Sequence, residues 1–298
     1  MAFYYTTLKN RRFDDVPQRY GESDTLLYAL GIGLGADPFD LKQLRFVYEE
    51  NLLALPTMAV VLGSAGFWMQ ASDTGLDWQN IVHLDQELTL HRPLQATGEV
   101  VGKTVVESLI DKRAQGALLT TRCDLFDRAT NELIATSRSG NLCRSNGHFE
   151  GDDPAGASVH RLPNRPPDLA CVLPSFAQAA LIYRLSGDRN PLHADPQQGQ
   201  RAGFERPILH GLATFGMAGH AALRVLCDYQ PARLKKLKAR FTAPFYPGET
   251  LRTTFWKYGN GSAGFQCHSV EREVMVINHG WVEYSEPEFI ANQAVGTV

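Results

Sequence analysis

The residues best suited to acid–base chemistry lie in one run, YRLSGDRNPLHADP, between Tyr183 and Pro196. Asp188 and His193 are five positions apart, with Asn190-Pro191 between them. A turn at this dipeptide would bring the carboxylate and the imidazole to one point, where they could divide acid and base work on a shared water molecule. An ordinary loop, in which Asp188 caps a turn, is also compatible with these residue types.

A second feature follows at PILHG, which ends on Gly211 and begins an apolar segment that runs to about Cys227. We expect a helix over residues 208–226. The first N–H groups of a helix have no intrahelical partner and carry partial positive charge. Because Gly211 has no side chain, a substrate carbonyl could approach its N–H closely, as in an oxyanion site. Alternatively, Gly211 only allows the helix to pack tightly.

These segments belong to a chain that divides nearly in half. The stretch from Gly147 to Asp168 is rich in Pro, Gly and Asp, which is typical of a linker. We assign residues 1–150 to a first domain, 151–168 to the linker and 169–298 to a second domain. In each half, apolar helix candidates precede segments in which apolar and polar residues alternate, the period of antiparallel strands. The sequence therefore predicts two α+β domains.

The two halves also resemble each other. Helix candidates at 23–33 and 52–66 correspond to those at 175–188 and 208–226, and Tyr28-Ala29-Leu30 matches Tyr183-Arg184-Leu185 at an offset of 155. Chance similarity between amphipathic segments is the alternative, but the shared order of elements favours a duplication that forms a pseudo-dimer. In each half we expect a sheet wrapped around one long, buried helix.

The reactive residues occur in one half alone. At the offset of 155, Asp188 falls on Gly33, Asn190 on Gly35 and His193 on Pro38. The first half therefore has neither the acid nor the base, and we expect one active site in each chain.

The run YRLSGDRNPLHADP, followed by ERPILHGL, resembles the hydratase 2 motif of the MaoC-like dehydratase and (R)-specific 2-enoyl-CoA hydratase family. In the first half, LLYALGIG, LRFVYEENLLALPT and HRPLQATGEV resemble the non-catalytic half of two-domain members, such as the hydratase unit of peroxisomal multifunctional enzyme type 2. The resemblance covers nearly the whole chain. It implies an α+β double hotdog fold, with each half a curved antiparallel sheet around a long helix.

The resemblance also implies roles for individual residues. Asp188 and His193 become a catalytic acid–base pair, Asn190 helps to orient the water or the pair, and Gly211 supplies an oxyanion N–H to the thioester oxygen. The implied reaction is that of a lyase, the hydration of trans-2-enoyl-CoA to (3R)-hydroxyacyl-CoA, with no cofactor beyond the CoA of the substrate. The first half would bind the acyl tail, which we expect the segment from Leu55 to Met58 to line.

Three other functions remain open. A hotdog thioesterase would hydrolyse the same substrate, an acyl-carrier-protein dehydratase would differ in the carrier, and an acyl-CoA-binding protein would do no chemistry. The order Asp-x-Asn-Pro-x-His favours hydration by resemblance. Relatives suggest a further homodimer of such chains.

Composition excludes some classes of partner. The 298 residues carry a formal net charge of −3, without the basic excess of a nucleic-acid or membrane-surface binder. Residues 52–69 lack charge and reach the lower limit of membrane-span length, but we expect a buried helix there. Five cysteines without a CxxC pair, an N-terminus without an apolar signal and a C-terminus without the usual peroxisomal tripeptide predict a cytoplasmic protein.

Three weaker patterns have simpler explanations. Gly31, Gly33 and Gly35 are spaced GxGxG rather than GxGxxG, and a helix candidate precedes them, so a dinucleotide loop is not expected. A metal site is not expected either, because no HExxH spacing occurs; its candidate ligands are His193, His210, His220, Asp188 and Asp195. The basic run at 233–240 either forms a solvated face or contacts the phosphates of CoA.

Overall fold

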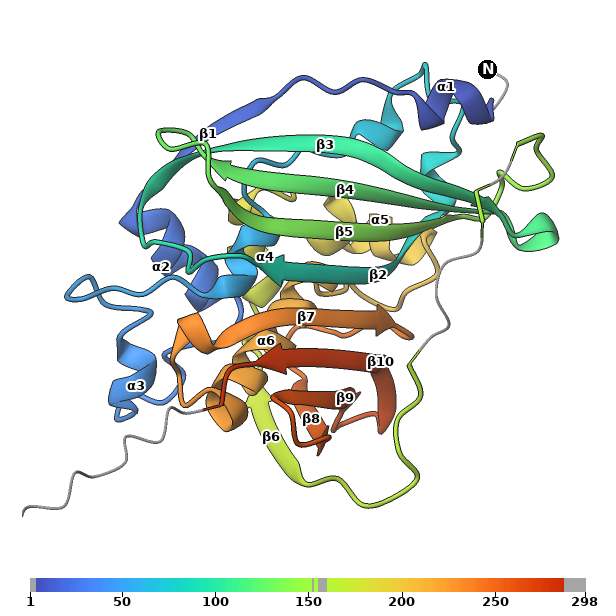
Figure 1. Cartoon of the computed structure of the whole chain (residues 1–298). Coiled ribbons are helices and arrows are strands. Elements are labelled where there is room, and N and C mark those ends of the chain that lie inside the picture. Colours follow the sequence, from blue (N-terminus) through green and yellow to red (C-terminus); the bar gives the residue numbers. More distant parts are fainter. Residues whose placement is uncertain (1–3, 152, 155–159, 287–298) are drawn as a thin grey trace, which may run out of the picture.

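The computed structural model describes residues 4–151, 153–154 and 160–286. Its ten strands form one continuous antiparallel sheet in the order β1-β3-β4-β5-β2-β7-β10-β9-β8-β6 (Figure 1). The strands of the first half are β1 (Val16–Tyr20), β2 (Ile81–Leu90), β3 (Gly98–Asp111), β4 (Ala117–Asp127) and β5 (Leu133–Cys143). Those of the second half are β6 (Leu169–Pro174), β7 (Leu234–Phe241), β8 (Thr250–Lys257), β9 (Ser262–Ser269) and β10 (Val274–Tyr284).

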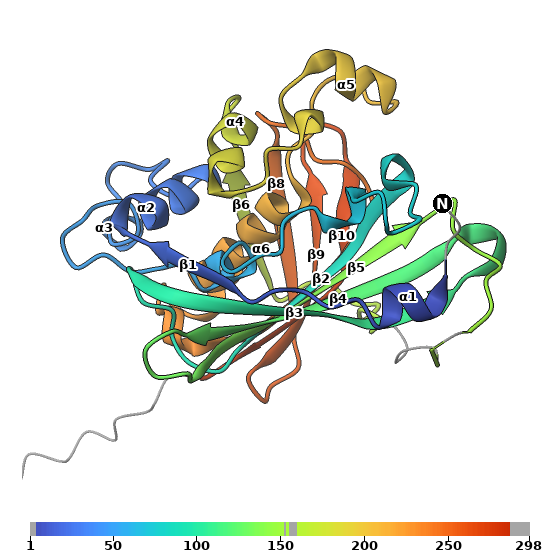
Figure 2. The ribbon, with the colours of Figure 1, turned by 90° about the horizontal axis from the view of Figure 1, so that it is seen from above.

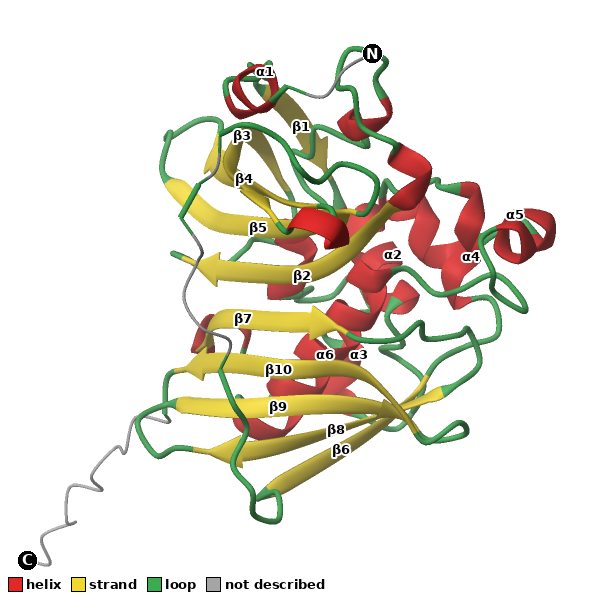
Figure 3. Cartoon of the chain, turned by 90° about the vertical axis from the view of Figure 1, so that its right-hand side faces the viewer, coloured by secondary structure: helices red, strands yellow, loops and turns green. Residues whose placement is uncertain are grey.

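The larger helices lie together on one side of this sheet (Figures 2 and 3). The α-helices are α1 (Tyr5–Lys9), α2 (Glu22–Gly31), α3 (Leu41–Leu44), α4 (Ala179–Tyr183), α5 (Pro196–Arg201) and α6 (Gly211–Leu226). The 3-10 helices are η1 (Pro56–Val60), η2 (Trp68–Gln70), η3 (Trp78–Asn80), η4 (Arg113–Gln115), η5 (Arg184–Ser186), η6 (Pro191–His193) and η7 (Pro231–Arg233). The expected helix at 208–226 is α6, which is buried along most of its length.

The prediction of a long helix over residues 52–66 is wrong, because the segment contains only the short 3-10 helix η1. Pro56 would remove a backbone hydrogen bond from the interior of such a helix, whereas it is tolerated at the first position of η1. Gly63 then adopts φ +59 where the backbone of Gly102 approaches it, so the chain turns away. The first half therefore has its sheet but no long central helix.

The two expected sheets are joined at β2 and β7, which pair in antiparallel register. The carboxylate of Glu87 on β2 lies 3.1 Å from Nζ of Lys236 and 3.3 Å from Nζ of Lys238. Asp85 pairs with Arg240 at 3.3 Å in the same seam. Three residues of the basic run thus form ion pairs between the two halves.

The matched segments of the two halves meet each other. The rings of Tyr28 on α2 and Tyr183 on α4 lie 5.8 Å apart, as expected if a pseudo-twofold axis passes between the repeats. In the first half, Gly33 and Gly35 adopt φ +89 and φ +78, so the positions that correspond to Asp188 and Asn190 form turns. These turns therefore explain Gly33 and Gly35 of the GxGxG pattern.

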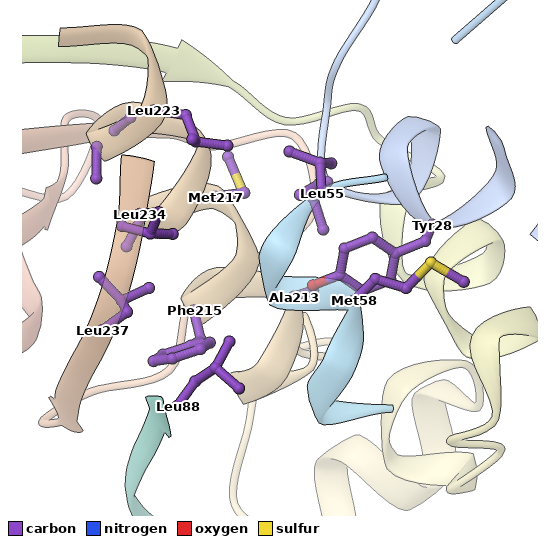
Figure 4. Packing of buried hydrophobic residues seen from close by; sticks show 14 of the residues in the cluster. Tyr28, Leu55, Met58, Leu88, Ala213, Phe215, Met217, Leu223, Leu234 and Leu237 are labelled. Atoms are coloured by element: carbon purple, nitrogen blue, oxygen red, sulfur yellow. The ribbon is translucent and has the colours of Figure 1, made fainter. Parts of the chain in front are cut away.

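The core is continuous across the two halves. Figure 4 shows Leu55 and Met58 of the η1 segment, which comprises η1 and its N-cap (residues 55–60), beside Tyr28 of α2 and Ala213 of α6. Gly219 of α6 faces Thr57 so closely that a Cβ there would lie 2.5 Å from Cγ2 of Thr57. Small residues on α6 thus allow the first half to pack directly against the helix.

We expect Gly219→Ala to destabilise the protein. Overpacking typically costs about 1–3 kcal/mol, more than the roughly 1 kcal/mol that Ala gains over Gly in a helix. Thr57→Ser removes Cγ2, so Gly219→Ala should become neutral or stabilising in that background. Urea unfolding of the wild type, both single variants and the double variant measures this coupling, and additive effects would contradict the predicted contact.

Among the described residues, no helix is long and apolar enough to cross a bilayer. The predicted linker lies partly outside the described residues, at 152 and 155–159, and so does the end of the second domain, 287–298. The linker residues 160–168 contain neither helix nor strand.

Candidate active site

The loop between α4 and α5 is shaped by its own side chains. Gly187 ends η5 at φ +126, a conformation that favours glycine. The carboxylate of Asp188 accepts a hydrogen bond from the N–H of Asn190 at 3.1 Å. The amide oxygen of Asn190 in turn accepts one from the N–H of Leu192 at 3.0 Å, which caps η6. This compact turn sets the separation of Asp188 and His193.

The structure brings Asp188 and His193 together with His210, the residue before α6. One oxygen of Asp188 and one ring nitrogen of each histidine all lie within 4.8 Å of one another. Asp188 is exposed, whereas both histidines are buried. A substrate could therefore reach the carboxylate from solvent while the imidazoles form the floor of the site.

The hydrogen bonds of His193 define which nitrogen can act as a base. Its Nδ1 lies 2.9 Å from the carbonyl oxygen of Ile208. Because a carbonyl oxygen only accepts, the ring carries its proton on Nδ1, and Nε2 keeps its lone pair. Burial of the ring lowers the pKa of His193. His193 is therefore a neutral imidazole with an acceptor nitrogen available.

His210 contacts both members of the pair. Its ring stacks on that of His193 with 3.7 Å between centroids, and its Nε2 donates to the backbone carbonyl of Asp188 at 3.1 Å. Burial, followed by the adjacent His193, lowers the pKa of His210 to about 3. From the sequence, this residue is only a possible metal ligand, although its position next to Gly211 indicates that it borders the site.

Gly211 is the first residue of α6, and His210 is the N-cap. In this position the N–H of Gly211 has no intrahelical acceptor and shares the positive end of the helix dipole. A Cβ at Gly211 would lie 3.5 Å from the ring of Phe241, an ordinary contact distance. The site thus combines a carboxylate, a neutral imidazole and an N–H donor at a helix terminus.

Two of the possible metal ligands lie elsewhere. Asp195 caps α5 by accepting from the N–H of Gln197 at 2.8 Å, and His220 lies 3.0 Å from the hydroxyl of Tyr229. Of the candidate ligands, only Asp188, His193 and His210 therefore lie together, with the rings of the two histidines inclined by 28°.

We expect the imidazole of His193 to titrate below its ordinary pKa of about 6.5 and to keep its proton on Nδ1 above that pH. The reason is that burial disfavours the cation and the Ile208 carbonyl holds the Nδ1 proton. ¹⁵N NMR of the histidine-labelled protein, with His193→Gln for assignment, measures both properties. Titration at or above pKa ~6.5, or a proton on Nε2, would contradict this orientation.

Comparison with known families covers both halves. A family described as MaoC like domain matches residues 158–279, and one described as MFE-2 hydratase 2 N-terminal domain matches residues 18–145.

The chain is 34% identical over 283 residues to a peroxisomal multifunctional enzyme type 2 from Mus musculus, a match that spans 92% of this chain but only 38% of that protein. It is 33% identical to a probable enoyl-CoA hydratase 2 from Dictyostelium discoideum, over 91% of this chain and 93% of the relative.

Solved structures agree with these matches. A MaoC-like dehydratase from Phytophthora capsici superposes with a TM-score of 0.82 at 32% identity, covering 95% of this chain and 99% of the other. A Mycobacterium tuberculosis protein with a double hotdog fold superposes with a TM-score of 0.57 at 18% identity. The predicted double hotdog fold is therefore confirmed, with its two sheets fused into one.

Proposed function

Because the chain belongs to the MaoC-like dehydratase and hydratase 2 family, we propose that it hydrates trans-2-enoyl-CoA to (3R)-hydroxyacyl-CoA and catalyses the reverse dehydration. The observation that carries the proposal is the junction of the Asp188 loop with the start of α6. Within 4.8 Å it gathers the carboxylate of Asp188 and a ring nitrogen each of His193 and His210, and Gly211 follows His210 as the first residue of α6.

In the proposed reaction, the conjugated thioester makes C3 of the substrate electrophilic. The water lies between Asp188 and Nε2 of His193, and Asn190 keeps the loop in shape. His193 accepts one proton as the water oxygen bonds to C3, and Asp188 stabilises the resulting imidazolium. The pair then returns one proton to C2, so that H and OH both derive from one water and both residues regain their starting states.

Negative charge develops on the thioester oxygen when C3 is attacked. The N–H of Gly211 would donate to this oxygen, and the dipole of α6 would add to the stabilisation. No group of the protein changes oxidation state in this sequence, and the CoA enters as part of the substrate.

The first half, residues 1–150, would bind the acyl tail and take no part in proton transfer. Leu55 and Met58 are both buried, beside Tyr28 of α2 and Ala213 of α6 (Figure 4). We therefore infer that a long tail gains space by moving the η1 segment, whereas a short tail does not require this. A homodimer and a cytoplasmic location remain predictions from the sequence.

The direct test follows the absorbance of the enoyl thioester with crotonyl-CoA, a medium-chain and a long-chain enoyl-CoA. The product's handedness is read with an (R)-specific dehydrogenase. Loss of the enoyl signal with an R product supports the proposal. Release of free thiol identifies a thioesterase, and turnover of only the acyl-carrier-protein thioester identifies the carrier dehydratase. Binding of the enoyl-CoA without turnover, in folded protein, would instead identify an acyl-CoA-binding protein.

A further inference from the structure

We propose that His210 is a positioning residue that holds both members of the Asp188–His193 pair. This inference rests on the proposed hydration. His210 would act through two separate contacts, one to the backbone of Asp188 and one to the ring of His193, and would itself exchange no proton with the substrate.

The first contact anchors the exposed carboxylate. Asp188 lies on a loop between η5 and η6, and Nε2 of His210 donates to its carbonyl oxygen at 3.1 Å. His210 is itself held at the N-cap of α6, where its carbonyl accepts from the N–H groups of Ala213 and Thr214. The hydrogen bond therefore ties a loop to a rigid helix, and an error of about 1 Å in placing such a group can reduce the rate about 10²-fold.

The second contact covers one face of the base. The rings of His210 and His193 stack at 3.7 Å, and His210 is only 1% exposed. A neutral ring in this place excludes water from His193 without repelling the imidazolium that forms in the reaction. The groups that bear on the titration of His193 are Asp188, Arg184 and His210.

The stack continues into the first half of the chain. Tyr183 packs on His210 with 5.0 Å between centroids, and Tyr28 packs on Tyr183 at 5.8 Å. His210 is thus confined between two rings, and the half that has neither acid nor base supports His193 through this series of contacts.

Two variants separate the contacts. His210→Phe keeps a flat ring over His193 but loses the donor to Asp188, so kcat should fall by roughly 10²-fold while the acidic limb of the pH–rate profile stays in place. His210→Gln keeps a donor at the position of Nε2 but exposes His193 to water. Its acidic limb should move to higher pH, because less desolvation raises the pKa of His193, while kcat on the plateau falls less.

His220, within α6, provides matched controls for His210 at the N-cap of that helix. Like His210 it is 1% exposed, with Nε2 hydrogen-bonded and Nδ1 without a partner among the described residues. His220→Phe and His220→Gln should lower stability to a similar extent, but leave kcat and the pH profile as in the wild type. They report the effect of losing any buried histidine from α6.

The proposal is overturned if the folded His210 variants match their His220 controls in both kcat and pH profile. Should a variant not fold, ¹⁵N NMR of the wild type decides. The proposal requires His210 to stay neutral, with its proton on Nε2, from about pH 5 to about pH 8; a cation or an Nδ1 proton overturns it. Failure of hydration in the wild type would instead refute the proposed function itself.

Discussion

Asp188→Asn should lower kcat by roughly 10²- to 10⁴-fold, the usual contribution of a positioned acid or base. The amide keeps the shape of the side chain and an oxygen that can accept the hydrogen bond from the N–H of Asn190. The amide lacks the negative charge that would hold the water and stabilise the imidazolium of His193. Because Asp188 is exposed, the loss of charge leaves no buried group unpaired, and the fold should persist.

The measurement is the rate of enoyl-CoA hydration near neutral pH, with circular dichroism to establish folding. Asp195→Asn is the matched control, since this nearby carboxylate caps α5 instead of facing the pair. It should cost about 1 kcal/mol of stability at most, as for a weakened helix cap, with little effect on kcat. Equal rates for the two variants would remove Asp188 from the mechanism.

Gly211→Pro should lower kcat by roughly 10²- to 10³-fold, as expected when one donor of an oxyanion site is lost. Proline removes the N–H, yet it is favoured at the first position of a helix, which Gly211 occupies. The preceding His210 has φ −57 and ψ 137, the extended conformation that a residue before proline prefers. The substitution therefore removes the donor with little disturbance of α6.

Gly211→Ala distinguishes the loss of the N–H donor from the effect of adding a side chain at this position. It keeps the N–H, and its Cβ would meet Phe241 at 3.5 Å, an ordinary contact. This variant should retain most of the activity. If Gly211→Pro loses kcat with KM little changed, the N–H acts mainly in the transition state. A proline variant as active as the alanine variant would show that the developing charge is stabilised elsewhere.

The two halves of the chain meet beside α6, close to the candidate active site. The first half contributes η1 to the core beside α6 and Tyr28 to the stack of rings that ends at His193. A change on this interface, such as Gly219→Ala against Thr57, can therefore alter the space available to the acyl tail. The rates with long-chain and short-chain substrates, compared in that variant and in its Thr57→Ser background, would distinguish an effect on tail binding from an effect on proton transfer.

Local patterns in the sequence determined most of the loop that carries Asp188 and His193, together with the elements beside it. The turn at Asn190-Pro191 brings Asp188 and His193, five residues apart in the sequence, close together in space, and Asn190 caps η6 within this turn. The apolar run after His210 is long and, unlike 52–66, contains no proline, and it forms α6. Alternation of apolar and polar residues predicted the antiparallel strands because one face of the sheet is covered and the other is solvated.

Only the tertiary structure decided what these elements meet. An apolar run such as 52–66 suits a helix or any other buried segment, and the close approach of Gly102 to Gly63 makes it turn. The fusion of the two sheets comes from backbone pairing between β2 and β7, which are far apart in the chain, and ion pairs accompany it. The role of His210 was hidden for the same reason, because its two contacts join a loop to a helix start. Spacing along the chain predicts which residues can turn toward one another, but contact between distant segments is determined by packing.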